Sequence, residues 1–238
     1  MIKMIKKAMV LAAGFGKRLK PLTLDCPKPL LEIGNETLLS NTLHFLKSLG
    51  IEEVVINTHY LSDHIVNYIK NNNFYLDIKI VLEKNKILDT GGGIANAINN
   101  FSDEPFVIIN PDTIWGDKYL NEFMSLKKLF FQNEKKHCSI LLVNKKKSFD
   151  KNFKGDFALK NNIVSRKSND KLDYIYTGLQ IIDSRVFSGF NSKVFSINVI
   201  WDKLIEKNKL TGFESNLDFL HVSTLKIYES LLEKHFKH

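Results

Sequence analysis

A loop that could hold phosphate follows the first apolar stretch of the chain. Gly14 and Gly16 flank Phe15, and the cations Lys17 and Arg18 come directly after them. Glycines let the backbone approach a ligand closely, so several N–H groups can converge on an anion while the two cations add charged donors. Arg18 is one of three arginines among 34 basic residues, and its planar guanidinium suits a phosphate. The segment therefore predicts a phosphate-binding loop, and a tight turn with solvated cations is the alternative.

Three prolines decide which kind of phosphate loop this is. A dinucleotide-binding loop of the G-x-G-x-x-G type needs a helix directly after its glycines. Here Pro21, Pro27 and Pro29 follow instead, and a helix interior does not tolerate them. The prolines predict a long, stiffened loop, which contains Lys28 between Pro27 and Pro29.

Further segments with polar residues or glycines follow other predicted strands. These are Asp89 to Gly93, Asn110 to Asp112, and Leu220 to Thr224. Ligands of open α/β sheets bind beyond the carboxyl ends of the strands, so we expect these segments to meet the loop at residues 14–18. The alternatives are a tightly packed helix start for the glycines and a helix N-cap for Asp112.

Strands and helices alternate along the first part of the chain, and strands separated by polar turns dominate the second. This order predicts an α/β fold with a Rossmann-like, mixed but mostly parallel sheet flanked by helices. We predict one domain over residues 1–238, with a core at about 1–145, a β-rich region at about 146–222 and a C-terminal helix at 223–238. The predicted strands are 8–12, 54–57, 78–82, 106–109, 139–143, 157–160, 163–165 and 174–182, and the predicted helices are 37–49, 63–69, 118–130, 199–207 and one that opens at 94 after three glycines.

Charge and composition narrow the classes of partner. The formal net charge of +8 favours anionic partners, but 31 of the 34 cations are lysines scattered along the chain, so no nucleic-acid footprint is predicted. No apolar run approaches the roughly 18 residues of a membrane span, so no membrane partner is expected. Cys26 and Cys138 lack metal-ligand spacing and are predicted to be reduced thiols, which favours the cytoplasm.

The motifs together resemble those of one enzyme family. Residues 11–30, L-A-A-G-x-G-x-R-L-x-P-L-T-x-x-x-P-K-P-L, are similar to the signature of the nucleotidyltransferases that make NDP-sugars from an NTP and a sugar 1-phosphate. Residues 88–94 resemble the base-binding segment of that family, and 110–112 resemble its N-G-D metal motif with proline in place of glycine. Residues 155–157 and 176–178 resemble sugar-side segments. The length and the D-T-G-G-G-I and G-D-F segments are most similar to the N-acetylmuramate 1-phosphate uridylyltransferases, with the mannose-1-phosphate guanylyltransferases as neighbours.

The resemblance implies a role for each motif. The core would bind the nucleotide and the region at 146–222 the sugar, with the loop at 14–18 around the triphosphate. An oxygen of the sugar 1-phosphate would attack the α-phosphorus in line, and no general base is needed because the nucleophile is already an anion. The implied catalytic residues are Arg18, Lys28 and Asp112; the nucleotide-binding residues are Leu11, Ala12, Ala13, Gly14, Gly16, Lys17, Glu83, Gly91 and Gly92; and the substrate-binding residues are Asn110, Gly155, Thr177 and Gly178.

One position departs from the family pattern. The family places its second metal carboxylate in a D-V-G-T segment, and the matching segment here starts with His221. Asp218 lies three residues away, an offset that points it to the opposite face of a strand. The implied metal ligands are therefore Asp112 and His221, with Mg²⁺ as the cofactor and Mn²⁺ as the alternative that accepts nitrogen more readily. An active enzyme is predicted, and a non-catalytic nucleotide-binding relative with a regulatory role is the alternative. The nucleotide (UTP or GTP) and the identity of the sugar 1-phosphate stay open. The oligomeric state also stays open, with a homo-oligomer as one possibility.

Overall fold

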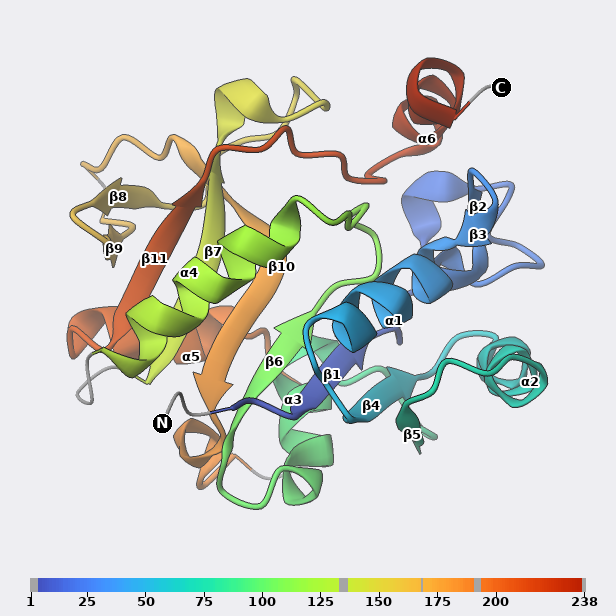
Figure 1. The fold of residues 1–238 in the computed structure, drawn as a ribbon, viewed down its shortest axis with the longest axis horizontal. Coiled ribbons are helices and arrows are strands. Elements are labelled where there is room, and N and C mark those ends of the chain that lie inside the picture. Colours follow the sequence, from blue (N-terminus) through green and yellow to red (C-terminus); the bar gives the residue numbers. More distant parts are fainter. Residues whose placement is uncertain (1–3, 133–136, 168, 191–193, 237–238) are drawn as a thin grey trace.

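A mixed β-sheet runs through the centre of the molecule (Figure 1). The computed structural model describes residues 4–132, 137–167, 169–190 and 194–236, and within them the nine-stranded sheet has the order β5-β4-β1-β6-β10-β7-β11-β9-β8. Strands β5, β4, β1, β6, β7 and β11 run in one direction, and β10 lies antiparallel between β6 and β7. The strands are β1 (Lys7–Leu11), β4 (Glu53–Thr58), β5 (Asp77–Leu82), β6 (Pro105–Ile109), β7 (Cys138–Asn144), β8 (Ala158–Lys160), β9 (Ile163–Ser165), β10 (Tyr174–Asp183) and β11 (Leu210–Ser215), with a separate hairpin of β2 (Glu32–Ile33) and β3 (Glu36–Thr37). The predicted fold class is confirmed.

Helices cover both faces of this sheet, because successive strand residues point to opposite sides. On one face Val10 packs with Leu43 of α1 and Phe123 of α4. On the other face Met9 packs with Ile94 of α3 and Trp201 of α5. The helices are α1 (Leu38–Ser48), α2 (Ser62–Asn71), α3 (Asp89–Ala97), α4 (Tyr119–Phe131), α5 (Asn198–Glu206) and α6 (Leu225–Leu231).

The parallel register brings several chain segments to one edge of the sheet. Leu11 at the end of β1 lies beside Asn57 of β4, and Asn57 lies beside Val81 of β5. On the other side of β1, Val10 lies beside Ile109 at the end of β6. The segments that follow these strands therefore start side by side, as expected for the carboxyl edge of an open α/β sheet.

Two elements differ from the expectation. Helix α3 begins at Asp89, so the three glycines are inside the helix and not before it. Packing overrides their poor helix propensity: a Cβ on Gly91 would lie 2.4 Å from the Phe195 ring, and a Cβ on Gly93 would lie 2.7 Å from both Asn57 and Glu83. Strand β11 was not predicted in detail, and it pairs parallel to β7 along its whole length.

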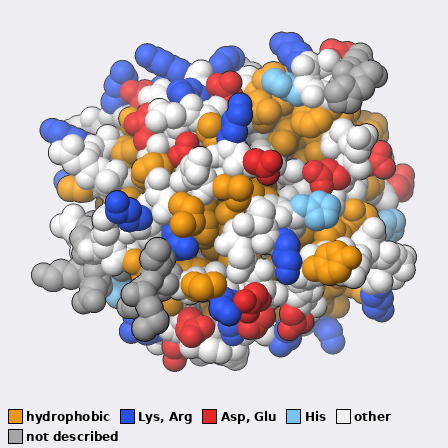
Figure 2. Space-filling view, viewed as in Figure 1, with side chains coloured by type: hydrophobic (Ala, Val, Ile, Leu, Met, Phe, Trp, Pro, Cys, Tyr) orange, Lys and Arg blue, Asp and Glu red, His pale blue; other side chains and the backbone are white. Residues whose placement is uncertain are grey.

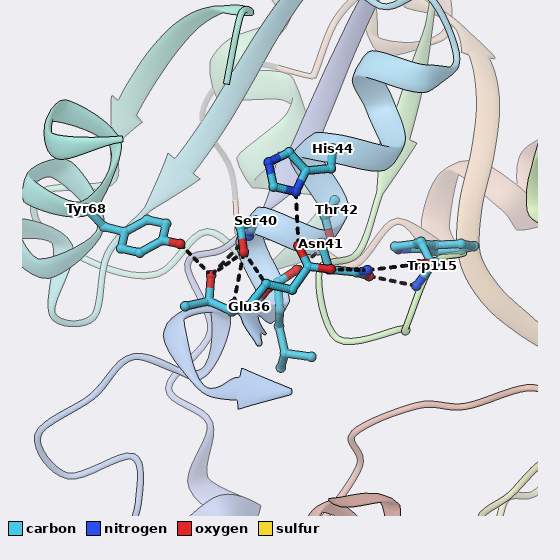
Figure 3. Close-up of polar contacts among 9 residues, drawn as sticks. Glu36, Ser40, Asn41, Thr42, His44, Tyr68 and Trp115 are labelled. Carbon is cyan, nitrogen blue, oxygen red and sulfur yellow. Dashed lines mark hydrogen bonds and ion pairs between the residues drawn. The ribbon is translucent and has the colours of Figure 1, made fainter. Parts of the chain in front are cut away.

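The start of α1 braces the loop that follows β6. Thr37 caps the helix by accepting a hydrogen bond from Ser40 N at 3.0 Å, and the Ser40 hydroxyl accepts from Thr37 N at 2.9 Å. The side-chain amide of Asn41 donates to Trp115 O and accepts from Trp115 N, each at 2.8 Å (Figure 3). This double contact fixes the far end of the loop at residues 110–115.

The charged side chains on the surface are scattered, as the distribution of lysines along the sequence predicts. Basic side chains are spread over the face in Figure 2 with acidic ones between them, and they form no continuous band there. In the described ranges no helix has the length and apolar character needed to cross a membrane. Cys26 and Cys138 are free thiols, and burial raises the pKa of each.

Candidate active site

A pocket of about 420 Å³ opens at the carboxyl edge of the sheet. Its lining comes from the loop after β1, from the ends of β4 and β6, from the start of α3 and from the segment before α6. The described residues that line it are 11–19, 28–29, 57, 87, 89–90, 110–112 and 223. The segments predicted to meet do meet here.

The loop after β1 has the backbone form that its glycines allow. Gly16 has φ +63°, and a Cβ there would lie 2.8 Å from a methyl group of Thr23, so a larger residue would be both strained and crowded. Gly16 O accepts from Leu19 N at 2.8 Å and from the Thr23 hydroxyl at 2.9 Å, which closes the short turn Lys17–Leu19. Arg18 is exposed on this turn and lines the pocket.

A second short turn places Lys28 in the pocket. Leu30 N donates to Pro27 O at 2.8 Å, so the P-K-P segment forms the tight turn Lys28–Leu30. From this turn Lys28 Nζ reaches Asp112 Oδ2 at 2.5 Å. Two residues 84 positions apart in the sequence thus form an ion pair at the pocket wall.

Asp112 is held from the other side by the segment before α6. Thr113 and His221 form an antiparallel bridge, and Val222 N donates to Asp112 O at 2.8 Å. This places His221 Nε2 3.2 Å from Asp112 Oδ2. Burial would raise the pKa of Asp112, but Lys28 and His221 together lower it well below its usual range. The carboxylate is therefore ionised at neutral pH.

The donor set fits a metal ion that is shared with a substrate. Asp112 Oδ1 is buried and has no hydrogen-bond partner in the described part of the chain, so it is free to ligate a cation. No cluster of three or more His, Cys, Asp or Glu side chains forms a complete metal site among those residues. Mg²⁺ is commonly held by one or two carboxylates together with substrate phosphates. Asp218 does not line this pocket and lies beside another cavity, near Tyr119; it follows β11, which ends at Ser215, so the strand offset does not apply to it.

The residues predicted on the base side are placed behind the pocket wall. Glu83 is 3 % exposed, and its two carboxylate oxygens accept from Asn57 Nδ2 and Leu88 N, both at 2.7 Å. Gly92 N donates to Phe195 O at 2.9 Å, and Gly91 packs under the Phe195 ring. The helix start offers Asp89 and Thr90 to the pocket instead. Direct base contacts by Glu83, Gly91 and Gly92 stay predictions.

The residues predicted on the sugar side divide into two groups. Asn110 lines the pocket, and Gly178 O accepts from Asn110 N at 2.8 Å. Thr177 O accepts from the Thr113 hydroxyl at 2.6 Å, so residues 177 and 178, at an irregular point of β10, support the loop that carries Asp112. Gly155 lies outside the pocket lining, where its backbone packs closely against Leu172.

Some residues of the site were missed by sequence reasoning. Asn57 lines the pocket, and its signal was a polar residue near the end of an apolar strand, at the same edge as the phosphate loop. Phe15 was read only as the spacer between two glycines, although its ring lies on the rim against His59 and Tyr60. Ser223 lines the far side and donates to the buried Asp150 at 2.6 Å.

Comparison with characterised proteins places the chain among related sequences. The model of the nucleotidyl transferase family matches residues 7–153. Two N-acetylmuramate α-1-phosphate uridylyltransferases align along most of their length: that of Caulobacter vibrioides is 27 % identical over 91 % of both chains, and that of Neisseria meningitidis serogroup B is 29 % identical over 92 % of this chain and 94 % of its own. Mannose-1-phosphate guanylyltransferase 1 of Arabidopsis thaliana is 38 % identical, but over 45 % of this chain and 31 % of its own.

Solved structures share the fold along the whole chain. The inositol-1-phosphate CTP transferase from T. maritima superposes with a TM-score of 0.77 at 18 % identity, over 98 % of this chain and 99 % of its own. A putative glucose-1-phosphate thymidylyltransferase from Bacillus anthracis has a TM-score of 0.77 at 20 % identity, over 98 % and 96 %. The resemblance to the sugar-1-phosphate nucleotidyltransferases is thereby confirmed, and the chain is an enzyme that belongs to the nucleotidyl transferase family.

Proposed function

We propose that this enzyme transfers the uridylyl group of UTP to N-acetylmuramate 1-phosphate, giving the UDP-sugar and pyrophosphate. An oxygen of the sugar 1-phosphate forms a bond to the α-phosphorus, while the bond from the α-phosphorus to the bridging oxygen breaks. The electron pair of the broken bond leaves with pyrophosphate. The incoming phosphate oxygen is an anion, so the protein supplies position and charge rather than a base.

A single observation carries the reaction class: Lys28 and Asp112 meet at 2.5 Å on the wall of a pocket that also contains the glycine loop with Arg18. The pocket thus combines backbone donors, the three cations Lys17, Arg18 and Lys28, and the carboxylates of Asp89 and Asp112 within one volume. This combination suits a triphosphate and a cation that bridges phosphates.

The side chains take distinct roles in this proposal. Arg18 binds the β- and γ-phosphates and stabilises the charge that develops on pyrophosphate. Lys28 binds the α-phosphate, and Asp112 and His221 would hold Mg²⁺. The bound cation would neutralise charge on the phosphate oxygens.

The choice of substrates is supported by the extent of the similarity. The two relatives that align over nine-tenths of both chains are named for N-acetylmuramate α-1-phosphate and uridylyl transfer. The similarity to the guanylyltransferase of A. thaliana is higher in identity, but it covers less than half of this chain. Mannose-1-phosphate guanylyltransferase is therefore the second candidate.

The test is a pyrophosphate-release assay over a matrix of NTPs and sugar 1-phosphates. We expect the highest kcat/KM for UTP with N-acetylmuramate 1-phosphate. Tight calorimetric binding of GTP without detectable UTP binding would move the enzyme to the guanylyltransferase branch. Nucleotide binding without pyrophosphate release from any pair of NTP and sugar 1-phosphate would indicate a regulatory protein that retains the pocket.

Arg18→Ala is expected to lower kcat/KM about 10²-fold, because it removes a preorganised cation from the charge that forms on pyrophosphate. Initial rates of pyrophosphate release measure the effect. Lys20→Ala is the matched control, since Lys20 is also exposed but lies outside the pocket lining. A loss below about threefold for Arg18→Ala would make this arginine an ordinary surface cation.

His221→Asp is expected to lower the Mg²⁺ concentration that gives half-maximal rate, since it adds a second hard, charged ligand beside Asp112. Magnesium titrations of the initial rate measure the change. His221→Asn, which offers a neutral oxygen, separates the effect of charge from that of ligand type. An unchanged or higher requirement in His221→Asp would show that the ligand set is completed by other groups.

A further inference from the structure

A chain of hydrogen bonds ties together the ends of three neighbouring strands. Ala12 N, just beyond β1, donates to Asn57 Oδ1 at 3.0 Å. Asn57 Nδ2, on β4, donates to Glu83 Oε1 at 2.7 Å, and Leu88 N donates to Glu83 Oε2 at 2.7 Å. Asn57 and Glu83 are each only 3 % exposed. The chain therefore joins the phosphate loop, which starts at Ala12, to the loop at residues 83–88 that leads into α3.

The two ends of this chain fix the direction of every hydrogen bond in it. Ala12 N and Leu88 N are backbone groups that can only donate. Asn57 must therefore turn its oxygen toward Ala12 and its nitrogen toward residue 83. Residue 83 then faces a donor on both sides. Glutamine and glutamate have the same length, but only the glutamate carboxylate can accept a hydrogen bond at both of its terminal atoms. The hydrogen-bond pattern explains why a glutamate is buried here although no salt bridge joins it to any described residue.

Close packing leaves this pair no room to rearrange. A Cβ on Gly93 would lie 2.7 Å from both Asn57 Nδ2 and Glu83 Oε1, so the last glycine of the helix start makes room for their contact. Glu83 O also lies 2.6 Å from His59 Nδ1, and Glu83 N donates to Thr58 O at 2.8 Å. A substitution that reverses one donor cannot be relieved by moving the side chain away.

We propose that Asn57 and Glu83 are positioning residues of the nucleotide pocket, which hold the phosphate loop and the base-side loop at the spacing that a bound NTP requires. The inference rests on the proposed nucleotide-binding role of the pocket. Ala12 and Asn57 line the phosphate side, and Ile87 and Thr90 line the side next to Leu88. Glu83 acts on the nucleotide through Asn57 and Leu88, from behind the wall.

An exchange of the two functional groups tests this role. Glu83→Gln is nearly isosteric but turns an amide N–H toward either Asn57 Nδ2 or Leu88 N. Asn57→Asp places two carboxylates in direct contact. In the double variant Asn57→Asp, Glu83→Gln, the carboxylate at position 57 accepts from Ala12 N and from the amide at position 83, whose oxygen accepts from Leu88 N. Every hydrogen bond is restored, and the net charge equals that of the wild type.

The readouts are NTP affinity by calorimetry, KM and kcat from pyrophosphate release, and the midpoint of thermal unfolding. We expect each single variant to weaken NTP binding and raise KM by roughly tenfold or more, with kcat changed less than about threefold. The double variant should return to within about threefold of the wild type, and its unfolding midpoint should rise above both singles. Glu52→Gln, an exposed exchange of the same kind, should leave all three readouts unchanged.

The outcomes separate this inference from the function on which it rests. If the wild type binds no NTP, the proposed function fails and the positioning role fails with it. If the wild type binds an NTP and Glu83→Gln binds it equally well, the positioning role alone fails. A double variant that binds the NTP no better than the weaker single variant would also overturn the positioning role. If both single variants fail to fold, the double variant is compared with the wild type, and a double variant that does not recover wild-type NTP affinity overturns the role.

Discussion

Asp112→Asn is expected to lower kcat/KM by about 10³-fold, the upper range for loss of one preorganised electrostatic contact. The amide keeps the size of the side chain but removes the charge that faces Lys28 at 2.5 Å and the buried oxygen that is free for a cation. It also leaves the Lys28 ammonium, which is 15 % exposed, without its counter-charge, so the free energy of unfolding should fall as well. Initial rates and thermal unfolding measure the two effects.

Asp218→Asn is the matched control for this substitution. Asp218 is close to His221 in sequence, but it does not line the pocket, and its carbonyl oxygen accepts from the Tyr119 hydroxyl at 3.3 Å. The control should keep kcat/KM within about threefold of the wild type. A large loss of kcat/KM in Asp218→Asn with a small loss in Asp112→Asn would show that we have assigned the metal to the wrong carboxylate, and it would overturn the site as we describe it.

Lys28→Met is expected to lower kcat/KM by about 10²- to 10³-fold and at the same time to strengthen divalent-cation binding to the nucleotide-free protein. Lys28 Nζ lies 2.5 Å from Asp112 Oδ2, so a metal ion held by Asp112 Oδ1 would have to share the single negative charge of this carboxylate with the ammonium. The removal of the ammonium should therefore raise metal affinity while it removes the contact to the α-phosphate.

Titration of the free protein with Mn²⁺, followed by electron paramagnetic resonance, measures the second effect without any need for activity. Lys20→Met removes the same charge from an exposed position outside the pocket lining, and it should leave Mn²⁺ affinity unchanged. Equal Mn²⁺ affinity in Lys28→Met and the wild type would show that the two cations do not compete.

The part of the site that local chemistry determines was predictable from the sequence. Glycines permit backbone conformations that other residues avoid and prolines restrict them, so the tight loop at Gly16 and the stiffened loop through Pro21, Pro27 and Pro29 followed from the sequence, whereas the role of Lys28 was inferred through the family resemblance. The parallel order of the strands then predicted that Asn110 and this loop share one edge, as they do.

Long-range packing decided the features that the sequence did not reveal. The placement of His221 beside Asp112 was inferred through family resemblance, because no local rule relates two residues so far apart. The glycines of α3 were expected to precede the helix, but contacts with Phe195 and Glu83 outweigh their low helix propensity. Asn57 was missed because its role depends on the direction of hydrogen bonds in a neighbouring strand and loop.

The bridge between Thr113 and His221 has a consequence for the order in which the protein becomes functional. Strands β1, β4, β5 and β6 lie within the first half of the chain and can pair soon after synthesis, since chains fold from the N-terminus as they emerge. Val222 N, which holds Asp112 O, comes from close to the end. Contacts of such high sequence separation form late, so we expect the first strands of the nascent chain to pair before the carboxylate of Asp112 is held in place. A ribosome-bound chain that stops before residue 222 should accordingly be structured but inactive.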